Sequence, residues 1–264
     1  LCNRGRPRAT AAPDQEMPSA AAVEASAPGK VILFGEHAVV HGARPVAAAV
    51  TSLRVHATYQ GRTDGVFRIE LRDVGEAFEC RARDDLGVER GRGDKVPRPE
   101  AHLPRSALPR GAVLERAQKA TARHTNTGSS PTRAKNHDVN GSSSSLVVAL
   151  YLLAELGDVD GGTLRVQAAG LPIGAGLGSS AAFAVATAAA LFVAAKRYCS
   201  ESGGADDDGA DPDDDDLAAI DAWAFAAEVI AHGRPSGLDN AVSCRGGGVV
   251  VCRVLLVEDD ASLG

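Results

Sequence analysis

A glycine-rich segment, Leu171–Ala182, contains the residues best suited to binding a phosphate group. It carries alternate glycines followed by two hydroxyl residues: Gly174, Gly176, Gly178, Ser179 and Ser180. Glycine lets the backbone approach a ligand closely and adopt a positive φ. The Ala- and Val-rich run that follows predicts a helix, whose first N–H groups and dipole attract an anion. The segment therefore predicts a phosphate-binding loop at a helix N-terminus.

Two common phosphate-binding motifs do not describe this loop. A P-loop requires a lysine directly after its last glycine, but Ser179 follows Gly178. The dinucleotide-binding fingerprint requires a third glycine where Ser179 stands. A flexible connection before a buried helix is the alternative interpretation, so residues elsewhere in the chain must decide between the two.

Three charged side chains could serve the same chemistry. Lys30 begins an apolar run, Glu228 lies within a predicted helix, and Asp239 lies in a turn-rich loop. Separately, they could be a surface lysine, a polar helix position and a turn cap. Together with the glycine loop, an amine and two carboxylates form the set required for phosphoryl transfer. In that reaction, positioning and charge neutralisation provide most of the catalysis.

Composition limits the class of protein. The chain has 264 residues, 44% of them hydrophobic, which is enough for a sizeable core. Its formal net charge of -6 argues against general nucleic-acid binding. The five cysteines show neither zinc-site nor disulfide spacing, which favours a reducing compartment. Apolar runs are interrupted or Ala-rich, so we predict no membrane span and expect a cytoplasmic protein.

The pattern of apolar residues predicts the elements that position these side chains. Residues 23–34 are predicted to form an extended segment, a tight Pro28-Gly29 turn and a buried strand. Residues 51–60 and 66–71 alternate on either side of a glycine-containing turn, which predicts a β-hairpin. One more strand and three helices are predicted; the strand is Leu164–Ala169, and the helices are Leu146–Leu156, Ala181–Tyr198 and Leu217–Ala231.

Other segments have a low-complexity composition. Residues 1–22 are predicted to be a disordered extension, with Met17 as the natural start of translation. Residues 81–140 are rich in Arg, Pro, Gly and Ser and are interpreted as an insertion with one short helix near 112–122. A nucleic-acid arm is the alternative, but no aromatic residues are interleaved. The acidic run at 203–216 is interpreted as a solvated loop rather than a metal site.

Three segments carry a resemblance to known enzymes. They are Ala27–Gly42 (APGKVILFGEHAVVHG), Gly174–Ala182 (GAGLGSSAA) and His232–Ala241 (HGRPSGLDNA). Together they resemble the GHMP small-molecule kinases, and the first and third segments resemble the mevalonate kinases within that group. The resemblance covers roughly residues 20–72 and 142–257.

The resemblance implies a fold and a reaction. The fold is α+β, a mixed sheet with helices on one side, as in the ribosomal protein S5 domain 2-like N-terminal domain of GHMP kinases. The implied domain spans residues 23–257. The reaction is ATP-dependent phosphorylation of the terminal hydroxyl of mevalonate to 5-phosphomevalonate, an isoprenoid and sterol precursor. Mevalonate, ATP and Mg²⁺ are the implied partners, without nucleic acid or membrane, and both a monomer and a homodimer remain open.

The resemblance also implies roles for individual residues. Asp239 would be the catalytic base, and Lys30 would stabilise charge beside it. Glu36 and His37 would lie at the mevalonate end of the site. The ATP phosphates would be bound by the whole loop: Gly174, Ala175, Gly176, Leu177, Gly178, Ser179 and Ser180. Oxygens of Ser180 and Glu228 would hold Mg²⁺ together with phosphates and water.

The chain departs from the family pattern in two ways. It ends before the third glycine-rich motif, which the family carries in its C-terminal domain, and Ala168-Ala169 replace a hydroxyl residue before the loop. We therefore expect an N-terminal fragment with the C-terminal domain largely missing, a truncated tail at 258–264, and little activity of the chain alone. Another GHMP kinase with a different alcohol substrate and a non-catalytic nucleotide-binding remnant are the alternative functions.

Overall fold

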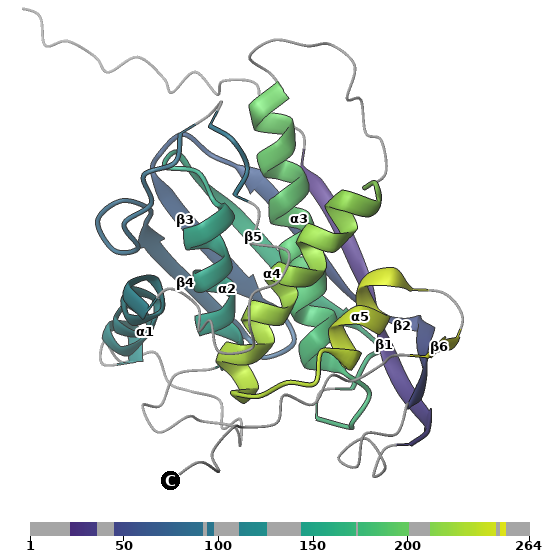
Figure 1. Ribbon diagram of the computed structural model, residues 1–264. Helices are drawn as coiled ribbons and strands as arrows, with labels where there is room; N and C mark the ends of the chain where they lie inside the picture. The colour runs from purple at the N-terminus through teal and green to yellow at the C-terminus, as the bar shows by residue number, and fades with distance from the viewer. Residues whose placement is uncertain are drawn as a thin grey trace, which may run out of the picture.

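One mixed β-sheet forms the framework of the protein (Figure 1). The computed structural model describes residues 22–35, 45–91, 94–97, 111–125, 144–172, 174–200, 212–246 and 249–251. Its strands are β1 (Val23–Phe34), β2 (Val46–Gly61), β3 (Val66–Leu71), β4 (Glu76–Arg81), β5 (Gly161–Ala169) and β6 (Val249–Val251). The strand order is β1-β2-β5-β3-β4, and β6 pairs with β2. Among the described strands, β3 and β5 are parallel and the other neighbours are antiparallel.

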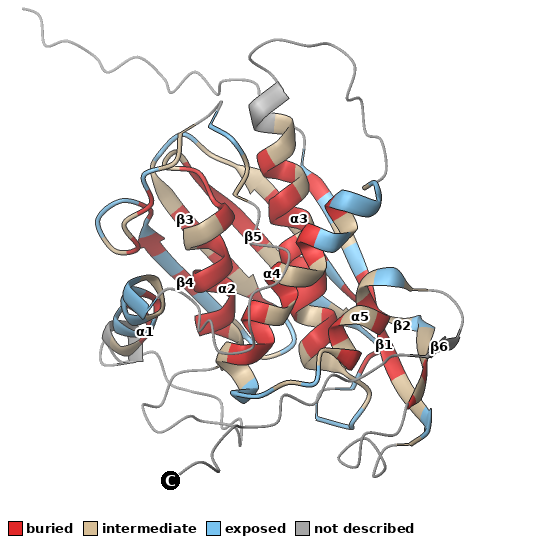
Figure 2. Ribbon diagram, in the orientation of Figure 1, coloured by how far each residue is buried: buried red, intermediate tan, exposed pale blue. Residues whose placement is uncertain are grey.

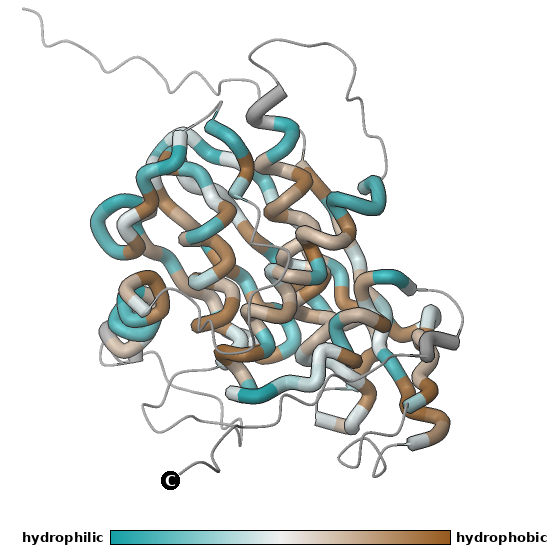
Figure 3. Tube along the Cα trace, in the orientation of Figure 1, coloured by the Kyte–Doolittle hydropathy of each residue, from teal (hydrophilic) through white to brown (hydrophobic). Residues whose placement is uncertain are grey.

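Helices cover one face of this sheet (Figure 1). They are α1 (Gly111–Thr125), α2 (Ser144–Leu156), α3 (Ser179–Ser200), α4 (Asp214–His232) and α5 (Leu238–Arg245). The core lies between the helices and the sheet, where α2, α3 and α4 turn their buried residues inward (Figure 2). The hydropathy of the residues follows their burial, since exposed turns and helix ends are hydrophilic (Figure 3). The predicted α+β fold, a mixed sheet with helices on one side, is thereby confirmed.

Helix α3 lies at the centre of the helical layer. Its side chains are mostly small, which allows close packing, and it contacts β1, β2, α2 and α4. Residues Ser179–Arg197 are long and apolar enough to cross a membrane by length and composition, but 67% of this apolar stretch is buried within the protein. Because α3 is buried against the sheet and two helices, its apolar composition is that of a core helix. The N-terminus of α3 is thereby held firmly at the end of the glycine loop.

The predicted hairpin between residues 51–60 and 66–71 is wrong. Strand β5 lies between β2 and β3, pairing with both, and β3 instead forms a hairpin with β4. The alternating pattern identified both strands correctly, because alternation reports which face is buried. It contains no information on a partner that follows about 100 residues later in the chain.

The predicted turn at Pro28-Gly29 is also wrong. Strand β1 continues through these residues, and a register shift against β2 lies between Pro28 and Gly29. Proline has no N–H to donate and glycine tolerates an irregular backbone, so the pair favours a bulge as well as a turn. The bulge displaces the following residues of β1, including Lys30, relative to a regular strand.

Two segments of low-complexity composition contribute to the folded core. Asp213 accepts a hydrogen bond from the Asp216 backbone N–H (2.8 Å), and the buried Asp216 carboxylate binds Lys196 at 2.6 Å. The end of the acidic run is therefore a helix start rather than a solvated loop, because carboxylates there cap N–H groups and favour the dipole. Within the predicted insertion, Arg90 donates to the carbonyls of Leu156 (2.6 Å) and Gly157 (3.0 Å) at the C-terminus of α2.

The predicted short helix within the insertion is present as α1, which packs against α2. Other predicted segments lie outside the described residues: 1–21, 98–110, 126–143, 201–211 and 252–264. The three predicted long helices and the strand Leu164–Ala169 are all present, with boundaries that differ by at most a few residues.

Candidate active site

The glycine loop links β5 to α3 and has the backbone that its glycines require. Gly174, Gly176 and Gly178 all have positive φ, at 77°, 75° and 69°. A side chain strains this conformation, so the alternate glycines are explained by backbone geometry. Helix α3 then begins at Ser179, so its first N–H groups face the end of the loop. The loop has the form of an anion-binding turn.

Strand β1 carries Lys30 to the same place. The Lys30 N–H donates to the carbonyl of Leu177 (2.8 Å), which ties the strand to the loop. A Cβ at Gly29 would lie 2.9 Å from that carbonyl oxygen, so glycine permits the close approach. The Lys30 side chain is only 9% exposed, and its Nζ lies 3.1 Å from Oδ1 of Asp239. A buried ammonium group of this kind requires a paired anion.

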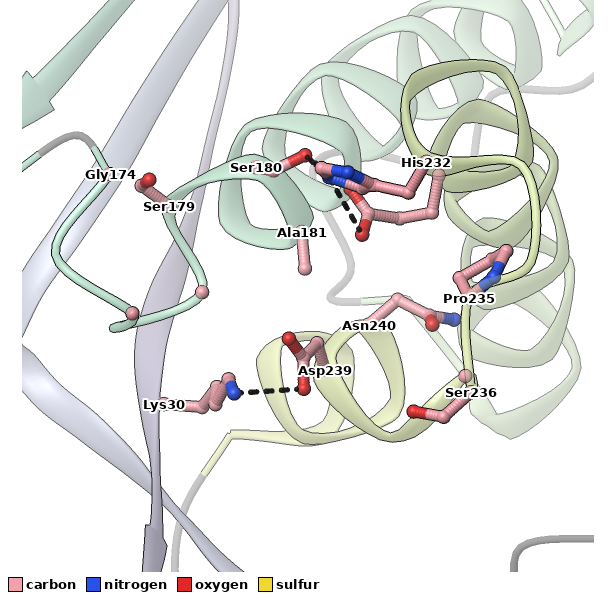
Figure 4. A pocket seen from close by; sticks show the side chains of 14 residues that line it. Lys30, Gly174, Ser179, Ser180, Ala181, His232, Pro235, Ser236, Asp239 and Asn240 are labelled. Atoms are coloured by element: carbon pink, nitrogen blue, oxygen red, sulfur yellow. Dashed lines mark hydrogen bonds and ion pairs between the residues drawn. The ribbon is translucent and has the colours of Figure 1, made fainter. Parts of the chain in front are cut away.

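Asp239 lies in the first turn of the short helix α5. Gly237 precedes this helix in the left-handed conformation, with φ 79°. Its carboxylate is 36% exposed and faces the cavity beneath the loop, while Lys30 holds one of its oxygens (Figure 4). Asp239 is therefore both fixed by a cation and accessible to a ligand.

A second pair of side chains, Ser180 and Glu228, lines the same cavity. Ser180 Oγ donates to Oε1 of Glu228 at 2.5 Å, and Glu228 is 5% exposed. Burial raises the pKa of Glu228, while the hydrogen bond from Ser180 and the nearby His232 oppose that rise. His232 Nε2 lies 3.0 Å from Ser180 Oγ and 3.8 Å from Glu228 Oε2. These three side chains form one contiguous polar cluster at the start of α3 and the end of α4.

Both pairs face one open cavity of about 340 Å³. Figure 4 shows Lys30 and Asp239 on one side, Ser180 and His232 on the other, and Ser179, the first residue of α3, at the edge. The volume is in the range of small-molecule sites. The cavity therefore offers a set of backbone N–H groups, one amine and two carboxylates to a single ligand.

The structure brings most of the predicted site residues together. The predicted residues that line the cavity are Lys30, Gly174, Gly176, Gly178, Ser179, Ser180, Glu228 and Asp239. Ala175 and Leu177 belong to the loop but do not line the cavity, and Leu177 contributes through its carbonyl. Glu36 and His37 lie outside the described residues.

The sequence-based site omitted His232 and Asn240, which also line the cavity. His232 follows Glu228 by four positions on the same helix, so the two side chains share a face. That spacing could have identified His232. The contact of Asn240 depends on the packing of α5 against α4, which no local pattern reveals.

The oxygens of Ser180 and Glu228 fit a magnesium ion. A hydroxyl and one buried carboxylate face the same cavity at hydrogen-bond distance from each other. Magnesium prefers oxygen ligands, and commonly takes one or two from the protein and the rest from phosphates and water. No cluster of three or more His, Cys, Asp or Glu that could hold a metal ion is found among the described residues.

Two alanine substitutions in the loop distinguish the effect of backbone strain from the effect of displacing Lys30. A Cβ at Gly178 would lie 2.7 Å from Lys30 Cγ, whereas one at Gly176 would meet no atom within 4 Å. Both alanine variants adopt a strained φ costing about 1–3 kcal/mol, so both should weaken nucleotide binding. Gly178→Ala should in addition lower kcat for the phosphoryl transfer that the resemblance implies, because the new Cβ displaces Lys30. Steady-state kinetics would check this, and equal kcat values for the two variants would contradict it.

Comparison with known proteins supports a family assignment. Residues 148–248 match the family described as GHMP kinases N terminal domain. The chain is 33% identical to the mevalonate kinase of Schizosaccharomyces pombe over 222 residues, covering 84% of this chain and 48% of the relative. It is 35% identical to the mevalonate kinase of Mus musculus over 230 residues, covering 84% and 52%. The chain thus spans about half the length of the curated relatives it matches.

A solved structure has a similar fold. The mevalonate kinase of Methanococcus jannaschii superposes with a TM-score of 0.53 at 19% identity, covering 88% of this chain and 54% of that one. At this level of identity the similarity concerns the fold. Residues 148–248 therefore match the N-terminal domain of the GHMP kinases, and the sequence of the chain is similar to the mevalonate kinases of that family.

Proposed function

We propose that the gene product, the polypeptide encoded by the whole gene containing this sequence, transfers the γ-phosphoryl group of ATP to the terminal hydroxyl of mevalonate. Sequence similarity to the mevalonate kinases supports the substrate. One geometric observation supports the reaction: the Lys30–Asp239 pair and the Ser180–Glu228 pair face the same cavity beneath the glycine loop. A nucleotide and an alcohol can thus meet between them.

The acceptor hydroxyl is activated by Asp239 and Lys30. Asp239 accepts the hydroxyl proton as the oxygen bonds to the γ-phosphorus and the bond to ADP breaks. Lys30, held 3.1 Å from Asp239, stabilises the negative charge that develops on the acceptor oxygen. Glu36 and His37 are assigned to the mevalonate end by resemblance only.

The phosphate groups are bound by the loop and the start of α3. Backbone N–H groups between Gly174 and Ser180 hold the phosphate oxygens and orient the γ-phosphorus toward Asp239. Ser180 and Glu228 would hold Mg²⁺, which when bound neutralises phosphate charge during transfer. The loop and the two oxygens thereby fix the donor relative to the base.

A coupled assay of ADP release tests this function. The gene product should release ADP only with both ATP and mevalonate, and mass spectrometry should identify 5-phosphomevalonate. Galactose, as a competing alcohol, should be phosphorylated at least about 10²-fold less efficiently, because unsatisfied polar groups penalise the wrong substrate. Efficient use of another alcohol would favour another GHMP kinase. ATP binding without any transfer would favour a non-catalytic protein.

A further inference from the structure

The helix that carries Asp239 depends on neighbouring elements for its position. Helix α5 has only eight residues, and its N-cap residue Gly237 provides no side-chain hydrogen bond. Isolated helices this short are unstable in water. The place of Asp239 in the cavity is therefore set by the contacts that α5 makes with the rest of the protein.

The buried side chains of Ser243 and Asn240 join α5 to other elements by hydrogen bonds. Ser243 Oγ donates to the Pro28 carbonyl (2.8 Å), which ties α5 to the bulge before Lys30. Asn240 Nδ2 donates to Oδ1 of Asp221 (2.6 Å) and is 3.4 Å from the Asp221 carbonyl. Asn240 is only 2% exposed and directly follows Asp239. Its amide must point N–H toward Asp221, because a carboxylate can only accept.

Asp221 lies on the same helix as Glu228. The two are seven positions apart on α4, or about two turns, so they lie on the same side of the helix. One carboxylate binds Ser180, at the phosphate side of the cavity, and the other binds Asn240, beside the base. A single rigid helix thus connects both sides of the site.

The environment of Asp221 supports a specific role. Burial raises the pKa of Asp221, while the Asn240 amide and the charge of Arg245 oppose that rise. An ionised carboxylate at a half-buried position is costly unless its hydrogen bonds are made. The Asn240 amide provides such a bond, so loss of either partner would leave a buried polar group unsatisfied.

We infer that Asp221 is a positioning residue for the phosphoryl-transfer reaction, holding Asp239 in register with Lys30 and Ser180 through its hydrogen bond to Asn240. This inference rests on the proposed function for its kinetic consequences. Its structural content, the maintenance of the Lys30–Asp239 pair, is independent of the substrate. Asp221 itself does not line the cavity.

Three variants of the gene product test the inference. Asp221→Ala removes the acceptor, whereas Asp221→Asn retains an oxygen that accepts from Asn240. Asp214→Ala removes an exposed carboxylate from the first turn of the same helix and is the control. Asp221→Ala should lower kcat about 10–100-fold, because a displacement on the order of 1 Å is costly in catalysis, with KM for ATP within about twofold. Asp221→Asn should retain kcat within about threefold, and Asp214→Ala should match the wild type.

A second readout does not require catalysis. The rate at which an amine-reactive ester acylates Lys30, followed by peptide mass spectrometry, reports whether Asp239 still protects that amine. It should rise several-fold in Asp221→Ala and remain at the wild-type rate in Asp221→Asn and Asp214→Ala. If the alanine variant does not fold, Asp221→Leu, which has nearly the shape of aspartate but offers no acceptor to Asn240, replaces it.

The outcomes separate the inference from the proposed function. An unchanged kcat and Lys30 acylation rate in Asp221→Ala would overturn the inference, as would an equal loss in Asp221→Asn. A protein that phosphorylates no mevalonate but shows the expected acylation rates would overturn the proposed function while supporting the position of Asp221.

Discussion

Replacing Asp239 by asparagine is expected to lower kcat for phosphoryl transfer by about 10²–10⁴-fold, the range for losing a general base. Asparagine has nearly the same shape and keeps an oxygen that can accept a hydrogen bond from Lys30 Nζ, now 3.1 Å from Asp239 Oδ1. It cannot accept a proton at neutral pH. The chemical step is therefore lost while the cavity retains its shape.

Nucleotide binding should survive this substitution. Ser180 lies across the cavity from Asp239 and donates to Glu228, so the Kd for ATP should change by no more than about twofold. Binding can be measured by titration of a fluorescent ATP analogue, and kcat by ADP release. Asp214→Asn, an exposed carboxylate on α4, is the matched control and should leave both quantities unchanged. Turnover by Asp239→Asn at the wild-type rate would exclude the assignment of the base.

The glycine loop was predictable because its chemistry is local. Alternate glycines followed by hydroxyls at the start of an apolar run specify both the positive φ values and the helix that follows. The helices α2, α3 and α4 were predictable for a similar reason, since long apolar runs with clear ends leave little choice.

Strand partners depended on distant parts of the chain. β5 pairs with both β2 and β3, although about 100 residues separate it from them, so proximity in sequence favoured a hairpin that does not exist. Composition was also misleading near Asp216, where an acidic run that predicts a solvated loop continues into the buried first turn of α4. In both cases, tertiary packing overrode a local preference.

The residues around the Lys30–Asp239 and Ser180–Glu228 pairs were the hardest to identify. Resemblance indicated Lys30, Ser180, Glu228 and Asp239, but it did not indicate the contacts that hold them. The bond of Asn240 to Asp221 joins two helices across 19 positions, and neither residue type is unusual at its place in the sequence. Such supporting contacts become visible only when α5 is placed against α4.

Replacing Glu228 by glutamine should remove the metal-dependent part of catalysis without damaging the fold. Glutamine retains an oxygen that can accept the Ser180 hydrogen bond, now 2.5 Å, but it has no charge to offer a cation. At fixed Mg²⁺ and saturating ATP, kcat should fall roughly 10²–10³-fold, as expected for losing one stabiliser of transition-state charge. Raising the Mg²⁺ concentration should restore part of the lost rate in steady-state assays.

Although Glu228→Gln should lower kcat, the same substitution should raise the stability of the ligand-free protein near neutral pH. Burial raises the pKa of Glu228 in the folded state above its ordinary value of 4.5. Its contribution to stability is therefore fully present below that ordinary value and is lost as the pH rises through the folded-state pKa. Glutamine does not titrate, so the Tm of Glu228→Gln relative to wild type should increase from pH 4 toward neutrality.

Thermal melts across this pH range, with and without Mg²⁺ and ATP, would measure both effects together. Ligand addition should raise the Tm of the wild type more than that of Glu228→Gln, since ligands stabilise the state they bind. Glu24→Gln, an exposed carboxylate on β1, is the control and should show neither effect. A lower Tm for Glu228→Gln at neutral pH, together with an unchanged response to Mg²⁺ and ATP, would mean that Glu228 serves the fold. A higher Tm for Glu228→Gln at neutral pH, together with a smaller response to Mg²⁺ and ATP, would mean that the protein tolerates a buried, destabilising carboxylate because the reaction requires one.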